Sequence, residues 1–103
     1  MFTLRNATQA DQAAIRLLVR SARINPTGLD WRRFLVAVDE ANSLIGCGQI
    51  KPHDNSTCEL ASIAVQPAYR RQGIARALIE KLLNPNVLSS CEVYLTCREE
   101  LEP

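Results

Sequence analysis

The sequence has 103 residues, of which 47% are hydrophobic and 22% are charged. This length suits one domain with a single core and is too short for two independent ones. The formal net charge of +1 gives no global field that would attract nucleic acid or an anionic membrane, so any anion site must be built locally.

The first quarter of the chain predicts a strand followed by a helix. Residues 2–5 alternate apolar and polar side chains, which is typical of a short strand with one buried face. Thr8 and Asp11 form a capping arrangement, so we expect a helix over about residues 9–21. The sequence NPTG at 25–28 is a turn signal, because proline fixes one backbone angle and glycine admits a positive one.

Three strands are predicted next. The β-rich runs 34–38 and 44–51 are separated by the polar residues 39–43, a suitable length for a hairpin loop. The mostly apolar run 58–65 predicts another strand, and Pro67 stops it because proline cannot donate to a sheet ladder.

A helix and a strand complete the predicted elements. After the polar loop 68–72, residues 73–83 place their apolar side chains on neighbouring helical positions, and Pro85 ends this helix. Residues 91–97 contain the β-formers of a last strand. This order predicts an α/β (α+β) fold: a mixed, mainly antiparallel sheet with helices on its faces and a parallel crossover at its end.

The cysteines and the hydropathy indicate a cytoplasmic protein. Cys47, Cys58, Cys91 and Cys97 show no CxxC pair, so we expect no metal site and interpret all four as reduced packing residues. Cys91 and Cys97 share one face of their predicted strand. No apolar stretch approaches the roughly 20 residues that cross a bilayer, and no signal peptide is evident, so no membrane partner is expected.

The segment from Ile63 to Arg76 carries the most informative pattern, because it joins a strand to a helix through a basic loop. The first turn of a helix has unpaired N–H groups and roughly half a positive charge, which favours a phosphate. Gly73 lets a phosphate approach closely, and Ala75 is also small. Positive charge comes from Arg70, Arg71 and Arg76.

The loop also has interpretations other than a phosphate site. The arginines could form a solvated surface group, and Gly73 could serve only the packing at the helix entry. A GxxxxGK[ST] motif is absent, and Gly46-Cys47-Gly48 lies inside a predicted strand with no third glycine at Lys51. Nucleoside triphosphates and dinucleotides are therefore poor candidates.

The six residues RRQGIA at 70–75 resemble the Arg/Gln-x-x-Gly-x-Gly/Ala signature of GCN5-related N-acetyltransferases (GNAT). They follow an apolar strand and Pro67, as the family's motif does, and the resemblance covers nearly the whole chain. It implies one N-acetyltransferase domain over 1–103 that takes acetyl-CoA as cofactor. An acetyl group would pass directly to a primary amine of unknown identity.

The resemblance also implies roles for individual residues. The strand at 63–65 would pair with the pantetheine arm, the amides of 71–76 would bind the pyrophosphate, and an amide near Val65 would polarise the thioester carbonyl. The thioester would lie in an opening between Ala64 and the strand around Leu95. The implied cofactor-binding residues are Ile63, Ala64, Val65, Arg70, Arg71, Gln72, Gly73, Ile74, Ala75 and Arg76.

Glu59 is the candidate catalytic base, because several family members carry a glutamate early in the corresponding strand. The alternative is an exposed strand residue without a catalytic role. His53 lies in a polar loop and could be a base or an ordinary solvated histidine. Trp31 with Arg32 and Arg33 could form part of an acceptor-side surface, or the tryptophan could cover the core.

The sequence departs from the family's pattern at its C-terminus. Family members continue past the fifth strand into a helix, which often carries a tyrosine acid, and two more strands, whereas this sequence ends at Pro103. We therefore expect a domain truncated before these elements, in which neither Tyr69 nor Tyr94 takes the place of that tyrosine. A non-catalytic CoA-binding module is the alternative function, and the edge strand 91–97 could pair two copies into a homodimer. Nucleic-acid binding is disfavoured by the net charge and by the 5% aromatic content.

Overall fold

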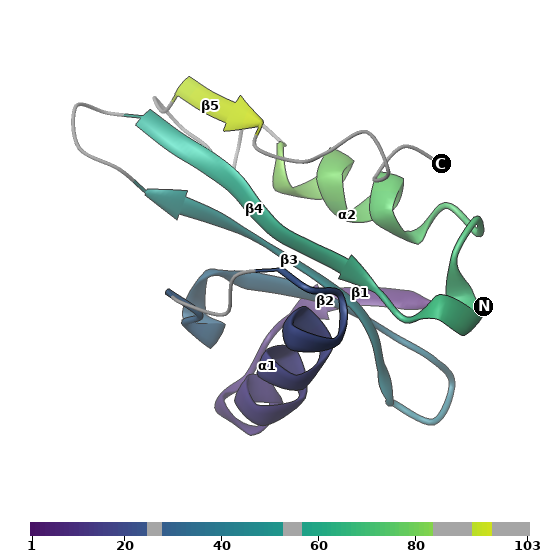
Figure 1. Ribbon diagram of the computed structural model, residues 1–103. Helices are drawn as coiled ribbons and strands as arrows, with labels where there is room; N and C mark the ends of the chain where they lie inside the picture. Colours follow the sequence, from purple (N-terminus) through teal and green to yellow (C-terminus); the bar gives the residue numbers. More distant parts are fainter. Residues whose placement is uncertain (25–27, 53–56, 84–91, 96–103) are drawn as a thin grey trace.

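One five-stranded sheet forms the centre of the molecule, with a helix on each face (Figure 1). The computed structural model describes residues 1–24, 28–52, 57–83 and 92–95. Its strands are β1 (Thr3–Asn6), β2 (Phe34–Val38), β3 (Leu44–Pro52), β4 (Thr57–Val65) and β5 (Glu92–Leu95), and its α-helices are α1 (Gln12–Ser21) and α2 (Ile74–Leu82). Each agrees with a predicted element, with small shifts at the ends.

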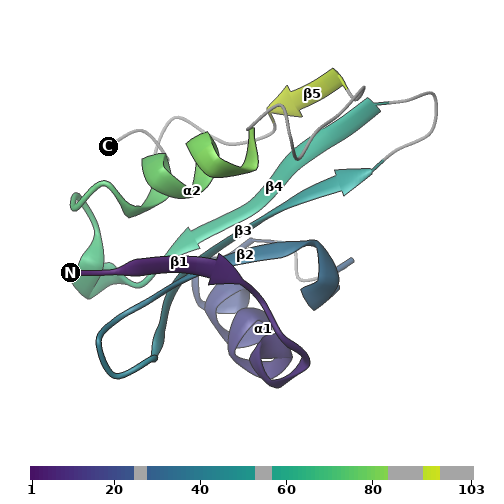
Figure 2. The same cartoon turned by 180° about the vertical axis from the view of Figure 1, so that it is seen from behind.

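The strands lie in the order β1-β2-β3-β4-β5. Neighbours from β1 to β4 are antiparallel, whereas β5 runs parallel to β4. Figure 2 shows the sheet from behind, with β1 and β5 at its opposite sides. The predicted fold class is therefore confirmed, including the parallel crossover through α2.

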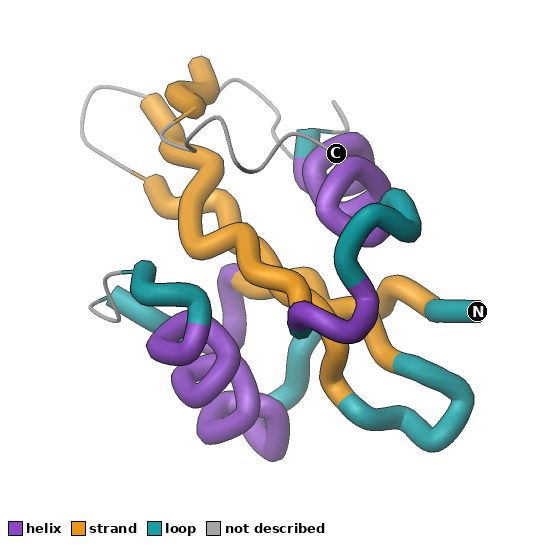
Figure 3. The backbone as a smooth tube through the Cα atoms, turned by 45° about the vertical axis from the view of Figure 1, so that its right-hand side comes forward, coloured by secondary structure: helices purple, strands orange, loops and turns teal. Residues whose placement is uncertain are grey.

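The two helices cover opposite faces of the sheet (Figure 3). Because side chains alternate along a strand, β2 contributes to both layers, and all five of its residues are buried. The α1 side buries Ile15, Leu18, Val19, Phe34, Val36, Val38, Cys47 and Ala64. The α2 side buries Leu35, Ala37, Ile45, Leu60, Ile63, Ile74, Leu78 and Leu82. Neither helix in the described part of the chain has the length and apolarity that a membrane span requires.

An ion pair connects β1 to the start of α1. The predicted helix begins with a 3-10 turn at Gln9–Asp11 before it becomes α-helical. The carboxylate of Asp11 accepts a hydrogen bond from the backbone N–H of Thr8 at 2.7 Å. It also accepts two from the guanidinium of Arg5, at 2.7 and 3.1 Å. Mainly through this contact, Arg5 holds the pKa of Asp11 below its ordinary value.

Replacing Asp11 with asparagine should lower the free energy of unfolding by about 2 kcal/mol at pH 7, since the ion pair with Arg5 is lost and the hydrogen bond from the Thr8 N–H is no longer charge-assisted. A lowered pKa in the folded state means that the charged carboxylate stabilises the fold at any pH above its unfolded value, near 3.9. This contribution is lost as the pH falls through the folded value, so the wild type and the variant should converge in acid. Urea unfolding at several pH values measures this difference, with Glu40→Gln, at an exposed position outside the described ion pairs, as the control. A difference in the free energy of unfolding between the wild type and Asp11→Asn that persists at pH 2 would contradict the stabilising role of the charged Asp11.

Gln12 of α1 holds the residues shortly before β2. Its side chain donates to Leu29 O and accepts from Trp31 N, both at 2.9 Å. Trp31 is half-buried against the α1-side cluster, and the Arg32 guanidinium lies 5.2 Å from the centre of its ring. The interpretation of Trp31 as a residue that covers the core is confirmed.

Candidate functional site

A loop with two left-handed residues connects β4 to α2. After Val65 the chain makes a 3-10 turn at Pro67–Tyr69, and α2 begins at Ile74. Within the loop, Arg71 has φ +64° and Gly73 has φ +80°. Left-handed residues in such a loop can turn successive backbone N–H groups toward one side, where they form a concave anion site.

In the second half of this loop the backbone N–H groups have no partner among the described residues. Ala77 N donates to Gly73 O at 2.9 Å. The amides at 71–76 have no acceptor within the described parts of the chain. A Cβ at Gly73 would meet no protein atom within 4 Å. A cluster of free donors therefore faces open space at the positive end of α2.

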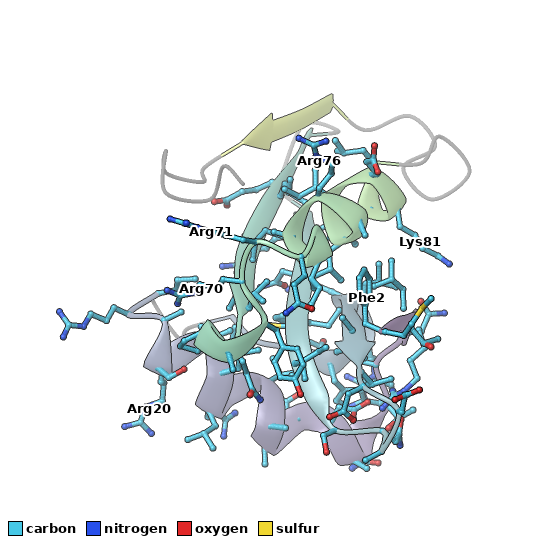
Figure 4. All side chains as sticks on the ribbon, turned by 90° about the vertical axis from the view of Figure 1, so that its right-hand side faces the viewer. Phe2, Arg20, Arg70, Arg71, Arg76 and Lys81 are labelled. Carbon is cyan, nitrogen blue, oxygen red and sulfur yellow. The ribbon has the colours of Figure 1, made fainter. Side chains whose placement is uncertain are left out.

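Arginines surround these donors (Figure 4). Arg70 and Arg71 project toward the same side of the molecule, with Arg20 of α1 below them, while Arg76 points upward from α2. Arg70, Arg71 and Arg76 are exposed, and none of them forms an ion pair with a carboxylate that the structure describes. Their charge is available to an anion, because no described neighbour neutralises it.

The second half of β4 has one open edge. β3 pairs with β4 as far as Val65, whereas the pairing with β5 covers Thr57 to Leu60. On the β5 side, residues 61–65 face no other described strand. Gln66 N donates to Ile45 O of β3 at 2.9 Å, so the peptide groups of Val65 point to the opposite, open edge. Arg70 Nε lies 3.4 Å from Val65 O at this edge.

A β-bulge bends β4 at the start of the open edge. In the register with β3, Cys47 faces Ala64 and Gln49 faces Ala61, so two residues of β4 oppose Gly48 alone. One of them, Ser62, has φ +58°. A Cβ at Gly48 would overlap Ile63 Cδ1, so the glycine leaves the space that the bent strand needs. Sequence reasoning missed this bulge.

A buried polar group lies beside the bulge. Gln49 is 0% exposed, and its Nε2 donates to Ser62 Oγ at 2.9 Å. Cys47 Sγ lies 3.6 Å from Ser62 O, and burial raises the pKa of this thiol to about 12, so it can donate. Sequence reasoning also missed Gln49, although a polar residue within the apolar run IGCGQI was a usable signal.

Glu59 occupies the position in β4 between Lys51 of β3 and Tyr94 of β5. It is half-buried. Lys51 and Gln49 are two residues apart and so share the α1 side of the sheet, and Glu59, directly opposite Lys51, faces the same side. The candidate base therefore lies two residues before the open edge, on the side where α1 packs.

Several sequence predictions fall outside the described residues. They concern His53, Cys91, Cys97 and the side chain of Cys58. The expected opening between Ala64 and the strand around Leu95 can be followed only as far as Leu95, which pairs with Leu60 of β4. Cys47 is buried and free, in agreement with its interpretation as a packing residue. Among the described residues no group of three His, Cys, Asp or Glu side chains could hold a metal ion.

The sequence and the overall fold are similar to those of known proteins. The model of the family described as "Acetyltransferase (GNAT) family" matches residues 5–102. The structure is similar to Rv2747 from Mycobacterium tuberculosis in complex with CoA and NLQ, with a TM-score of 0.81 and 27% identity over 96% of this chain and 67% of that one. No curated protein matches this sequence closely enough to count as a relative.

Two further solved structures share the fold at lower identity. N-acetylglutamate synthase from Neisseria gonorrhoeae, complexed with coenzyme A and N-acetyl-glutamate, has a TM-score of 0.78 at 18% identity, over 92% of this chain and 25% of that one. Diaminobutyrate acetyltransferase from Paenibacillus lautus, in complex with L-2,4-diaminobutyric acid and coenzyme A, has a TM-score of 0.71 at 21% identity. This match covers 90% of this chain and 64% of that one.

Proposed function

Because the chain belongs to the GNAT acetyltransferase family, we propose that it is an N-acetyltransferase that transfers an acetyl group from acetyl-CoA to a primary amine. The observation that carries this proposal is the set of amides around the left-handed Gly73 that have no acceptor among the described residues. A diphosphate fits these donors, since they face open space at a helix N-terminus. The CoA complex of Rv2747, at 27% identity, supports CoA as the ligand.

The cofactor would extend from the loop along the open edge of β4. The pyrophosphate would lie on the amides at 71–76, with Arg70, Arg71 and Arg76 adding charge. The amide groups of the pantetheine arm would pair with the backbone of Ile63, Ala64 and Val65, in the manner of an added strand. This edge is suited to the role because it lacks a strand partner among the described residues.

The proposed chemistry is direct attack of the amine on the thioester carbon. The carbon–nitrogen bond forms, the carbon–sulfur bond breaks, and CoA leaves as the thiolate, which takes up a proton from solvent or from a group in the site. The Val65 N–H, which points to the open edge, would stabilise the negative charge on the carbonyl oxygen. Glu59 would accept the amine's proton, directly or through a water molecule.

A titration with CoA, followed by amide NMR shifts, tests the proposed cofactor site. The largest shifts are expected at 63–65 and 71–76, since these amides would exchange solvent for the ligand. Shifts spread over Arg20, Arg23, Arg32 and Arg33 instead would contradict the proposal and indicate non-specific attraction of the anion. Thiol release from acetyl-CoA with a panel of amines then distinguishes an enzyme from a non-catalytic CoA-binding module.

We also propose a cytoplasmic location and the self-association of two copies of the chain. The free thiol of Cys47 in the core suits a reducing compartment. β5 is the last strand in the order of the sheet, and such an edge could pair with a second copy of the chain.

A further inference from the structure

Gln49 is a fully buried polar residue whose hydrogen bonds are incomplete. Its Nε2 donates to Ser62 Oγ at 2.9 Å, but its Oε1 finds no donor among the described residues. The neighbours on the α1 side, Phe34 and Cys47, are buried in an apolar cluster. An apolar side chain of similar size would avoid the unpaired oxygen, so packing alone does not favour glutamine here.

The hydrogen bond that Gln49 donates is accepted by Ser62, a residue with a strained backbone conformation. Ser62 has φ +58°, a backbone conformation that residues other than glycine, asparagine and aspartate rarely adopt. It stands in the bulge of β4, where glycine is the usual left-handed residue. A serine stays in this conformation only if its surroundings hold it there. Gln49 holds its hydroxyl, and Cys47 Sγ lies 3.6 Å from its carbonyl.

The bulge determines where the open edge points. Directly after Ser62, Ile63 fills the space over Gly48, and Ala64 returns to register with Cys47. The backbone from 63 to 65 is the segment that the proposed function assigns to the pantetheine arm. A change of φ at Ser62 would therefore redirect every donor and acceptor on this segment.

We propose that Gln49 is a positioning residue. By holding Ser62 in its left-handed conformation, it orients the backbone N–H and C=O groups of residues 63–65 toward the pantetheine arm of the acyl-CoA. This inference rests on the proposed function, because it concerns the same edge. Gln49 itself does not touch the cofactor. Its effect passes through the Ser62 hydroxyl and the bulge.

Gln49→Met removes the donor and keeps the volume. The variant should lose affinity for CoA by about tenfold, because small displacements of positioned groups weaken binding strongly. Its melting temperature should equal or exceed that of the wild type, since the unpaired oxygen disappears. In the ligand-free protein, the amide signals of 61–65 should shift, and those at the N-terminus of α2 should not.

Ser62→Gly in the Gln49→Met background provides the decisive control. Glycine adopts the positive φ without help, so the double variant should recover the CoA affinity of Ser62→Gly alone. If Gln49→Met is poorly folded, Ser62→Ala removes the same hydrogen bond with Gln49 in place and should show the same loss. Wild-type affinity in Gln49→Met with unmoved 61–65 amides, or a loss that Ser62→Gly does not restore, overturns the inference. A wild-type protein that binds no CoA contradicts the proposed function instead, and the ligand-free amide shifts still decide the role of Gln49.

Discussion

Gly73→Asp should lower the affinity for CoA by about 100-fold or more, because it places a negative charge where a diphosphate is expected and removes the space for it. The side chain would project from a left-handed residue into the open region beside the unpaired amides. Its carboxylate could also accept from those amides, and so compete with the phosphates for the same donors. Isothermal titration with CoA measures the loss directly.

Gly73→Asn is the matched control for backbone strain. Asparagine is as large as aspartate and also tolerates the left-handed region, so both variants should lose a similar free energy of unfolding, about 1 kcal/mol. The neutral variant should bind CoA much better than the acidic one. If both bind equally well, or if Gly73→Asp binds like the wild type while folded, the diphosphate does not lie at this loop.

Glu59→Gln should lower kcat by about 100- to 1,000-fold at neutral pH, which is the usual contribution of a general base. The side chain keeps its size and its place between β3 and β5, so the affinity for acetyl-CoA should stay nearly unchanged. The wild-type rate should rise with pH as the base loses its proton. In Glu59→Gln this rise of the rate with pH should be absent.

Glu80→Gln serves as the comparison for Glu59→Gln. Glu80 is an exposed residue of α2, and its change should leave both kcat and the pH profile unchanged. A Glu59→Gln variant that keeps its rate within a few-fold of the wild type, with a pH dependence like that of the wild type, would show that Glu59 is an ordinary strand residue. The base would then have to be sought elsewhere on the acceptor side.

Much of the fold could be predicted, because its signals are local. The apolar spacing at 73–83 predicts α2, and the polar residues at 39–43 predict the hairpin, in which Asp39 Oδ1 accepts from Ala41 N and Ser43 N at 2.9 Å. The 3-10 turn at the start of the first helix was not predicted, and neither was the contact of its Asp11 with Arg5 of β1, which forms only when the two elements meet.

The sequence by itself determined the order of the elements and the basic glycine loop before α2. Both depend on residues close together in the chain: helical or alternating periodicity, proline and glycine positions, and the charge beside Gly73. From these local patterns the resemblance to the GNAT family could be stated before the structure was known.

Only the tertiary structure decided the bend in β4 and the burial of Gln49. A serine at positive φ has little local preference for that conformation, and a glutamine within an apolar run does not show by itself which residue it will contact. Both follow from the register between β3 and β4, in which Gly48 leaves the space for Ile63 and Gln49 reaches Ser62. Pairing between strands is a non-local contact, so its irregularities appear only when the strands are placed side by side.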